Sequence, residues 1–177
     1  MYSEQNLTEM IVPFYLGEKP DSKGRTIQQI WTWDFEDLEC IHVYIQWLFP
    51  IREKSHFNPE APTMDKNVIQ AFRENRRLQE NLLKSFSVLL HFYGLLLTDT
   101  YEKIVVEKSD SCPERKREWV NLPDHNYLRI TRILKCLIAL GLRIEAQAFY
   151  KCLSQIYQEN SDQIGAETYQ YWTNAVN

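Results

Sequence analysis

The chain has 177 residues, of which 44% are hydrophobic and 25% are charged, so it is neither a disordered nor a collagen-like protein and is long enough for one compact domain. Aromatic residues make up 13% of the chain, while Gly occurs 5 times and Pro 7 times, which favours a helical domain with a bulky core over a β sandwich. The net charge of −4 gives no overall basic surplus, so we expect no nucleic-acid partner.

The cysteines and the apolar segments predict a cytoplasmic protein. The four cysteines are scattered and form no CxxC pair, which is typical of reduced thiols. The first six residues lack a basic region followed by an apolar stretch, so we expect no signal peptide. The most apolar run, 88–97, is far shorter than the roughly 20 residues of a membrane helix, so we expect no membrane span.

The N-terminal third predicts an arm followed by a central helix. Pro13 and the turn-forming stretch 18–24 oppose a continuous helix, so the residues up to about Gly24 are expected to form an irregular arm. From the N-cap residue Asp34 to Pro50, apolar residues recur at helical spacing and then on most sides, which predicts one helix in the middle of a bundle.

The middle of the chain predicts two helices and an irregular segment. Apolar residues at helical spacing indicate a short helix around Val68 to Phe72 and a longer one from Leu78 to Tyr93, capped by Gly94. The stretch 95–121 has weak periodicity, a β-like Ile104-Val-Val and a charged run. We expect it to be an irregular excursion between the third and fourth main helices, with one helical turn.

The C-terminal part predicts three more helices. Asp124 or Asn126 begins one helix, Gly141 ends it, and the next helix extends through Ile156, so the two form an αα-hairpin. A last helix is expected from about Gln163 to Val176. The prediction for residues 1–177 is therefore an all-α, single-domain helical bundle.

Motifs with a specific catalytic mechanism are missing from the sequence. It contains no glycine-rich phosphate loop, HExxH, CxxC or GxSxG, which makes an enzyme less favoured and predicts no cofactor. Glu39 and His42 form an E-x-x-H pair, the spacing that di-iron bundles use, but the only other copy follows Pro50 in an expected loop. They are weak metal candidates, and we predict no metal site.

Two polar stripes are the candidates for binding. Glu39, His42 and Gln46 lie at the border of an apolar helix face, where they form either a buried network that fixes helix register or one side of a ligand pocket. His125, Arg129 and Arg132 share a face near a helix N-terminus, where two guanidiniums can hold a carboxylate or phosphate. The alternative for the second stripe is ordinary pairing with acidic neighbours on a solvated surface.

Three blocks of the sequence resemble one known family. The block from His42 to Pro50, preceded by Asp34 to Glu39, is similar to the most characteristic block of the opioid growth factor receptor conserved region. His125 to Lys135 is similar to its second block and Phe92 to Gly94 to a third, in the family's order, with the resemblance covering about Phe14 to Val176. It implies an all-α domain.

The resemblance also implies a function in the animal members. These are receptors for an enkephalin peptide, are associated with the nucleus and restrain cell growth. Because the last expected helix lies close to Asn177, with no repeats of their kind after it, we expect a short stand-alone member of the family. Both polar stripes fall inside family blocks.

The first hypothesis is a non-enzymatic binding module with a pocket between the central helix and the Asn126 helix. A small anionic ligand or peptide end would bind to the arginines, with the other polar residues orienting it and the aromatic residues forming walls. The candidate residues are His42, Tyr44, Gln46, Trp47, His125, Tyr127, Arg129 and Arg132. The alternatives are a scaffold that meets a protein partner through its aromatic surface and the 95–121 stretch, and a small enzyme with His42 or His125 as acid or base.

Overall fold

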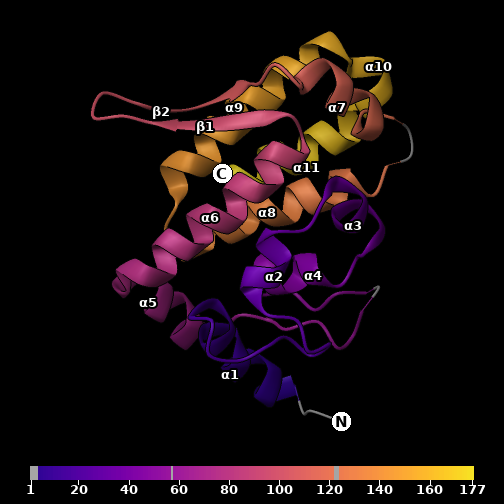
Figure 1. Ribbon diagram of the computed structural model, residues 1–177. Coiled ribbons are helices and arrows are strands. Elements are labelled where there is room, and N and C mark those ends of the chain that lie inside the picture. Colours follow the sequence, from indigo (N-terminus) through magenta and orange to yellow (C-terminus); the bar gives the residue numbers. More distant parts are fainter. Residues whose placement is uncertain (1–3, 57, 122–123) are drawn as a thin grey trace. The chain divides into compact units, whose positions relative to one another are not determined.

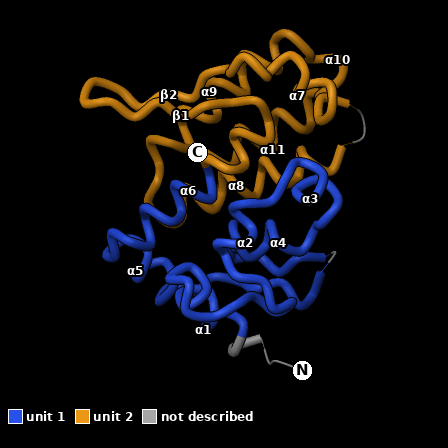
Figure 2. Tube along the Cα trace, in the orientation of Figure 1, with its two compact units in different colours: residues 1–86 blue, residues 87–177 orange. Residues whose placement is uncertain are grey.

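The computed structural model describes residues 4–56, 58–121 and 124–177, and its chain separates into two compact units, 1–86 and 87–177 (Figure 2). The described residues are mostly helical, with one two-stranded antiparallel sheet (Figure 1). The expected all-α class is therefore right for most of the chain and misses the strands.

Unit 1 consists of short helices and loops. Its helices are α1 (Glu4–Tyr15), α2 (Ile27–Trp31), α3 (Phe35–Cys40), α4 (Tyr44–Leu48), α5 (Lys66–Glu74) and the first part of α6 (Arg76–Phe92). The helices α5 and α6 confirm the two that the sequence predicts in this region. The ring of Phe14 packs on Trp47 at 5.3 Å between centroids, and that of Tyr15 packs on Phe72 at 4.9 Å, so aromatic residues form the centre of this core.

The expected irregular arm is wrong for residues 4–15, which form α1. Leu7, Ile11 and Phe14 are spaced four and three residues apart and are all buried, so one face of the helix enters the core. Pro13 lies in the last turn of α1, two residues before the helix ends. Proline cannot donate a backbone hydrogen bond, but a bond lost at the end of a helix reduces its stability only a little. Burial of this apolar face stabilises the helix by more than Pro13 destabilises it.

The expected single helix from Asp34 to Pro50 is also wrong, because it divides into α3 and α4. Ile41 ends α3 in an extended conformation, with φ −90° and ψ 125°. The hydroxyl of Tyr44 donates to the carbonyl oxygen of Leu38 at 2.9 Å, so a side chain satisfies a carbonyl that a continuous helix would pair with a backbone N–H. The break turns Tyr44, Trp47 and Leu48 into the core, where each is fully buried.

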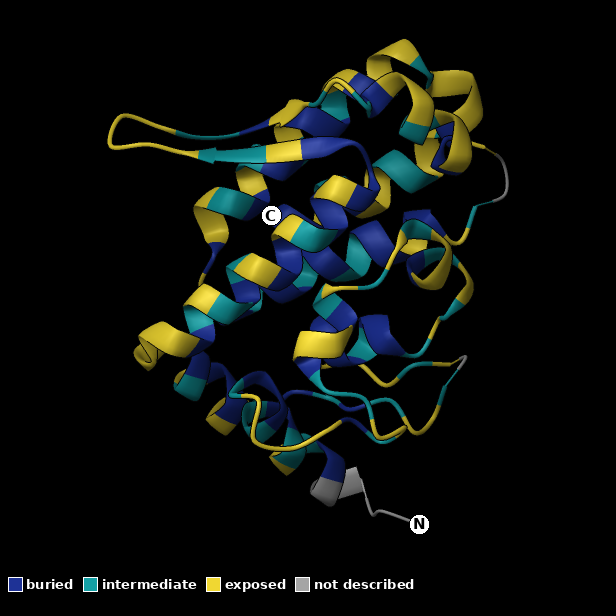
Figure 3. Ribbon diagram, in the orientation of Figure 1, coloured by how far each residue is buried: buried dark blue, intermediate teal, exposed yellow. Residues whose placement is uncertain are grey.

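Unit 2 contains the sheet and the longest helices. It holds the end of α6, the strands β1 (Leu95–Asp99) and β2 (Ile104–Lys108), and the helices α7 (Cys112–Trp119), α8 (Asn126–Leu140), α9 (Arg143–Glu159), α10 (Ser161–Ile164) and α11 (Ala166–Val176). Helices α8, α9 and α11 pack on one another, and β2 packs against α9. Figure 3 shows the buried side of these helices and the exposed loop between the strands.

The expected irregular excursion 95–121 is wrong, because it is an ordered hairpin followed by a helix of two turns. Leu95 pairs with Lys108 and Asp99 with Ile104 in antiparallel register. The helix α7 buries Cys112 and Trp119, and the indole N–H of Trp119 donates to the carbonyl oxygen of Tyr93 at 3.2 Å. Only these two residues of α7 are buried, so its sequence has the polar pattern of a loop.

The αα-hairpin of α8 and α9 confirms the sequence prediction. Gly141 ends α8 in the left-handed conformation at φ 103°, as expected for its position. The expected last helix is divided into α10 and α11 at Gly165, whose φ of 81° and ψ of 148° interrupt the helical backbone. Trp172 of α11 donates through its indole N–H to the carbonyl oxygen of Tyr127, which ties α11 to α8.

Candidate functional site

The four sequence-predicted residues of unit 1 lie in and around α4. Tyr44 and Trp47 are fully buried in the core, and His42, between α3 and α4, is exposed. The carboxamide oxygen of Gln46 accepts from the Asn58 side chain at 2.5 Å, and its amide donates to the Ser55 hydroxyl at 3.4 Å. Gln46 therefore holds the loop after α4 through two side-chain hydrogen bonds.

The break between α3 and α4 also falls between the two weak metal candidates. Glu39 belongs to α3 and His42 follows its end, so the i, i+3 helical spacing that would bring their side chains to one metal is lost. Among the described residues, no group of three or more His, Cys, Asp or Glu side chains is arranged to hold a metal ion.

The four sequence-predicted residues of unit 2 lie at the N-cap and in the first half of α8. Arg129 is only 5% exposed, and its guanidinium donates to the side-chain oxygen of Asn126 at 3.4 Å. The hydroxyl of Tyr93 donates to that same oxygen at 3.5 Å. Asn126 and Arg129 thus belong to a buried polar network, in which a charged group is held by hydrogen bonds.

The remaining three differ in exposure. His125 is exposed at the N-cap of α8, where its side chain makes no capping hydrogen bond, and Arg132 is half-buried one turn after Arg129. Tyr127 is buried, with its ring packed on Trp172 at 5.9 Å between centroids. Burial and the carboxylate of Asp124 raise the pKa of Tyr127 to about 12. The eight candidate residues are therefore divided between the two compact units, four in each.

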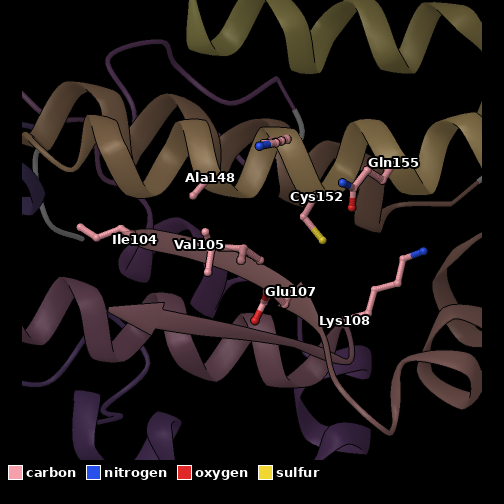
Figure 4. Close-up of a pocket in the computed structure, with 9 residues that line it drawn as sticks. Ile104, Val105, Glu107, Lys108, Ala148, Cys152 and Gln155 are labelled. Atoms are coloured by element: carbon pink, nitrogen blue, oxygen red, sulfur yellow. The ribbon is translucent and has the colours of Figure 1, made fainter. Parts of the chain in front are cut away.

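A hollow of about 360 Å³ lies between the hairpin and α9, and we call it the hairpin hollow. Figure 4 shows Ala148 and Cys152 projecting from α9 towards β2. Val106, Ala148 and Cys152 give it apolar walls. Lys108, Lys151, Gln155 and the carboxylate of Glu107 add polar groups. An apolar side chain or ring fits a space of this size and composition.

A second hollow of about 470 Å³ begins at Lys108 and extends along α7, and we call it the basic hollow. Lys108, Lys116 and Arg117 line it together with the carboxylate of Glu159, and Ser109, Cys112 and Pro113 complete its wall. A smaller hollow of about 210 Å³ shares Lys116 and Arg117 with it. Because Lys108 also lines the hairpin hollow, the apolar and basic spaces are neighbours.

Glu159, at the end of α9, is bound by two lysines of the basic hollow. Its Oε1 lies 2.5 Å from Nζ of Lys108 and its Oε2 lies 3.6 Å from Nζ of Lys116. The hydrogen bond from Lys108 and the positive charge of both lysines hold the pKa of Glu159 below its ordinary value. The carboxylate of Glu159 therefore contacts two of the three cations that line the basic hollow.

The thiols beside these hollows are buried and have raised pKa values. Burial raises the pKa of the Cys152 thiol to about 11 and also raises the pKa of Cys112. Since the thiolate is the reactive form, both stay protonated and act as apolar wall. The two hollows therefore combine apolar walls with cationic side chains.

Sequence reasoning missed these hollows. The charged run that contains Lys116 and Arg117, and the β-like Ile104-Val-Val, were both visible, but each was assigned to an irregular segment. Lys108 and Glu159 are 51 positions apart, so no local spacing brings them together. The run of three β-branched residues, Ile104-Val-Val, was the local signal for a strand there.

The comparisons with known proteins agree on one family. The family model described as "Opioid growth factor receptor (OGFr) conserved region" matches residues 5–177, which covers both units. The chain is 38% identical over 134 residues to opioid growth factor receptor-like protein 1 of Xenopus tropicalis, a match that covers 72% of this chain and 25% of the relative.

Mammalian relatives match in the same way. The opioid growth factor receptor of Homo sapiens is 38% identical over 116 residues, covering 66% of this chain and 17% of the relative. Opioid growth factor receptor-like protein 1 of Mus musculus is 37% identical over 133 residues, covering 73% and 26%. The chain therefore spans about a quarter or less of the length of these relatives.

No solved structure matches the chain significantly. Among the described residues, none of the helices combines the length and the apolar character needed to cross a membrane.

Proposed function

The chain belongs to the opioid growth factor receptor conserved-region family, and we propose that it is a non-enzymatic binding module for a peptide or small ligand that carries an anionic group beside an apolar group. The observation that carries the proposal is the meeting of the hairpin hollow and the basic hollow at Lys108. The apolar group would enter the first and the anionic group the second.

Exposed cationic side chains and apolar walls give the proposal its physical support. Within the described part of the chain, Arg117 and Lys151 are exposed and make no ion pair, so their charges are available to a ligand. The apolar walls at Val106 and Ala148 add burial of hydrophobic surface, and charge-assisted hydrogen bonds to the lysines add orientation. The names of the relatives describe receptors or receptor-like proteins, which supports a binding role.

The proposal is tested with a short peptide in which two glutamates follow a leucine, titrated into ¹⁵N-labelled protein and followed by NMR. We expect shifts at the amides of Val106, Lys108 and Lys116, and no binding of the same peptide with glutamines in place of the glutamates. Lys116→Ala and Arg117→Ala are expected to weaken binding about tenfold each, the value of one charge-assisted hydrogen bond.

Matched variants separate this site from other surfaces. Arg143→Ala removes the same charge from an exposed position on α9 outside the hollows and should leave binding unchanged. Ala148→Trp fills the hairpin hollow and should reduce binding while the helix α9 stays intact. Arg132→Ala tests the pocket predicted from sequence. If shifts gather around Arg132 and only Arg132→Ala abolishes binding, the ligand uses that pocket and the present proposal is wrong.

A protein partner without a ligand site is the second candidate. The exposed side chains of Leu96 and Tyr101 on the hairpin, at 51% and 112% exposure, favour it. Pull-down with the intact chain and with a Leu96→Ser/Tyr101→Ser variant tests it. Loss of a specific partner only with the variant would support a scaffold in place of a ligand-binding module.

A further inference from the structure

The charges around the basic hollow are unequal. Three cations, those of Lys108, Lys116 and Arg117, line it against the single carboxylate of Glu159. Glu114 and Glu118 lie on the same helix α7 but line none of the three hollows. With Glu159 in place, two positive charges of the lining stay uncompensated, and with Glu159 displaced, all three do.

The position of Glu159 shows how an anion fits. Each of its two oxygens faces a different lysine, one from the end of β2 and one from α7. The Glu159 side chain is 48% exposed, so it can rotate towards solvent without opening the core. The two lysines, at 34% and 26% exposure, are more enclosed and stay beside the hollow.

The three cationic side chains of the basic hollow favour an anion with more oxygens and more charge than a carboxylate. A carboxylate has two oxygens and one charge, so Glu159 contacts two of the three cations but compensates only one positive charge. A phosphate monoester has three terminal oxygens and a charge of about −1.5 to −2 near pH 7, which matches two lysines and one arginine. Arginine adds the planar fork that binds two phosphate oxygens together.

We propose that the basic hollow binds the phosphate group of a monoester, and that Glu159 occupies the two lysines as an intramolecular competitor until the phosphate displaces it. The inference rests on the proposed binding function and adds the class of ligand and its regulation. The organic part of the monoester extends past Lys108 into the hairpin hollow, whose 360 Å³ accommodates a ring or an aliphatic side chain. The monoester is either a small molecule or a phosphorylated peptide side chain, since the chemistry of recognition is the same.

The experiment compares phenyl phosphate, phenyl sulfate and benzoate, titrated into ¹⁵N-labelled protein at about pH 7.5, where the phosphate monoester is a dianion. All three carry the same ring, and phenyl sulfate has the tetrahedral shape with a single charge. We expect phenyl phosphate to bind at least about tenfold more tightly than the other two, with shifts at Lys108, Ser109 and Lys116. A phosphoserine peptide with a neighbouring leucine then distinguishes a peptide ligand from a small one.

Two variants test the competitor. Glu159→Gln keeps the shape but removes the charge, so binding of phenyl phosphate should become about fivefold to tenfold tighter. Lys108→Ala and Lys116→Ala should each weaken it about tenfold, and Glu118→Gln, a matched loss of charge outside the hollows, should change nothing. Circular dichroism of each variant confirms that it is folded.

The outcomes separate this inference from the proposed function. Equal affinity for phenyl phosphate and phenyl sulfate would overturn the selection of a dianion. Unchanged or weaker binding by Glu159→Gln would overturn the competitor. If the leucine-glutamate peptide binds at the hollows while phenyl phosphate does not, the proposed function stands and this inference fails. If neither binds there, both fail.

Discussion

The backbone of Cys112 lies directly against Gly94. A Cβ atom at Gly94 would stand 2.7 Å from the Cα of Cys112 and 2.9 Å from the Cβ of Arg115, closer than van der Waals contact allows. Gly94 has a φ of 77°, and it joins the end of α6 to β1. The missing side chain therefore lets α7, with Lys116 and Arg117, settle beside the hairpin.

Gly94→Ala is expected to destabilise the protein by about 2–4 kcal/mol, the sum of a left-handed backbone and an overpacked contact. Gly24→Ala is the matched control, because Gly24 has a φ of 79° and nothing within 4 Å of its Cβ position. It should cost only the backbone part, about 1 kcal/mol. Urea unfolding of both variants measures the difference, and equal losses would show that α7 does not press on Gly94.

Tyr127 predicts an alkaline limit to stability. Its pKa in the folded protein is raised to about 12 from 10.0, so between these values the unfolded state loses its proton while the folded state keeps it. Stability therefore falls as the pH rises through this window, by on the order of 2 kcal/mol. Urea unfolding across the window should show a smaller fall for Tyr127→Phe. Tyr101→Phe, the same change at the exposed loop between the strands, should behave like the unchanged chain, and a similar fall for all three would contradict the assignment.

Glu159 predicts a different effect in acid. Because its pKa is lowered in the folded protein, its contribution to stability is present above the pKa of the unfolded chain and is lost as the pH falls through the folded value. The ion pair is exposed, so Glu159→Gln should reduce stability by no more than about 0.5 kcal/mol near neutral pH. Thermal unfolding should show that this difference disappears in acid. A large loss that persists in acid would mean that Glu159 acts through packing.

The cysteines predict a graded reaction with iodoacetamide. Cys40 is exposed, whereas Cys112, Cys136 and Cys152 are buried and have raised pKa values. Intact mass should show one fast alkylation in the native protein, none in Cys40→Ser and four additions to the original chain in guanidinium chloride. Alkylation of Cys152 as fast as Cys40 would contradict the burial of its thiol.

The sequence allowed the long helices of unit 2 to be predicted because their signals are local. Between Asn126 and Ile156, apolar spacing and Gly141 specify two helices, and the structure has both. The same local rules failed from Asp34 to Pro50, because the hydroxyl of Tyr44 replaces a backbone donor at Leu38, and no propensity predicts that exchange. They also failed at α7, where only Cys112 and Trp119 are buried.

The candidate site was harder to predict than the fold. The two arginine positions on α8 looked like an anion clamp from their spacing, but Arg129 is buried beside Asn126, and spacing alone carries no information about depth. Lys108, Lys116 and Glu159 come from a strand and two helices that only tertiary packing assembles. Anion binding and its location therefore both stay predictions.

The ion pairs of Glu159 have a consequence for how binding responds to salt. A cationic surface usually gathers mobile ions from solution, and an anionic ligand that binds there sets them free, so its affinity falls steeply as salt is added. Here the carboxylate of Glu159 takes the place of some of these mobile anions. Because it is part of the chain, its local concentration does not change with the salt concentration of the buffer. The affinity of this hollow for an anion should therefore vary less with ionic strength than three cations imply, and removing Glu159 should restore the steeper dependence.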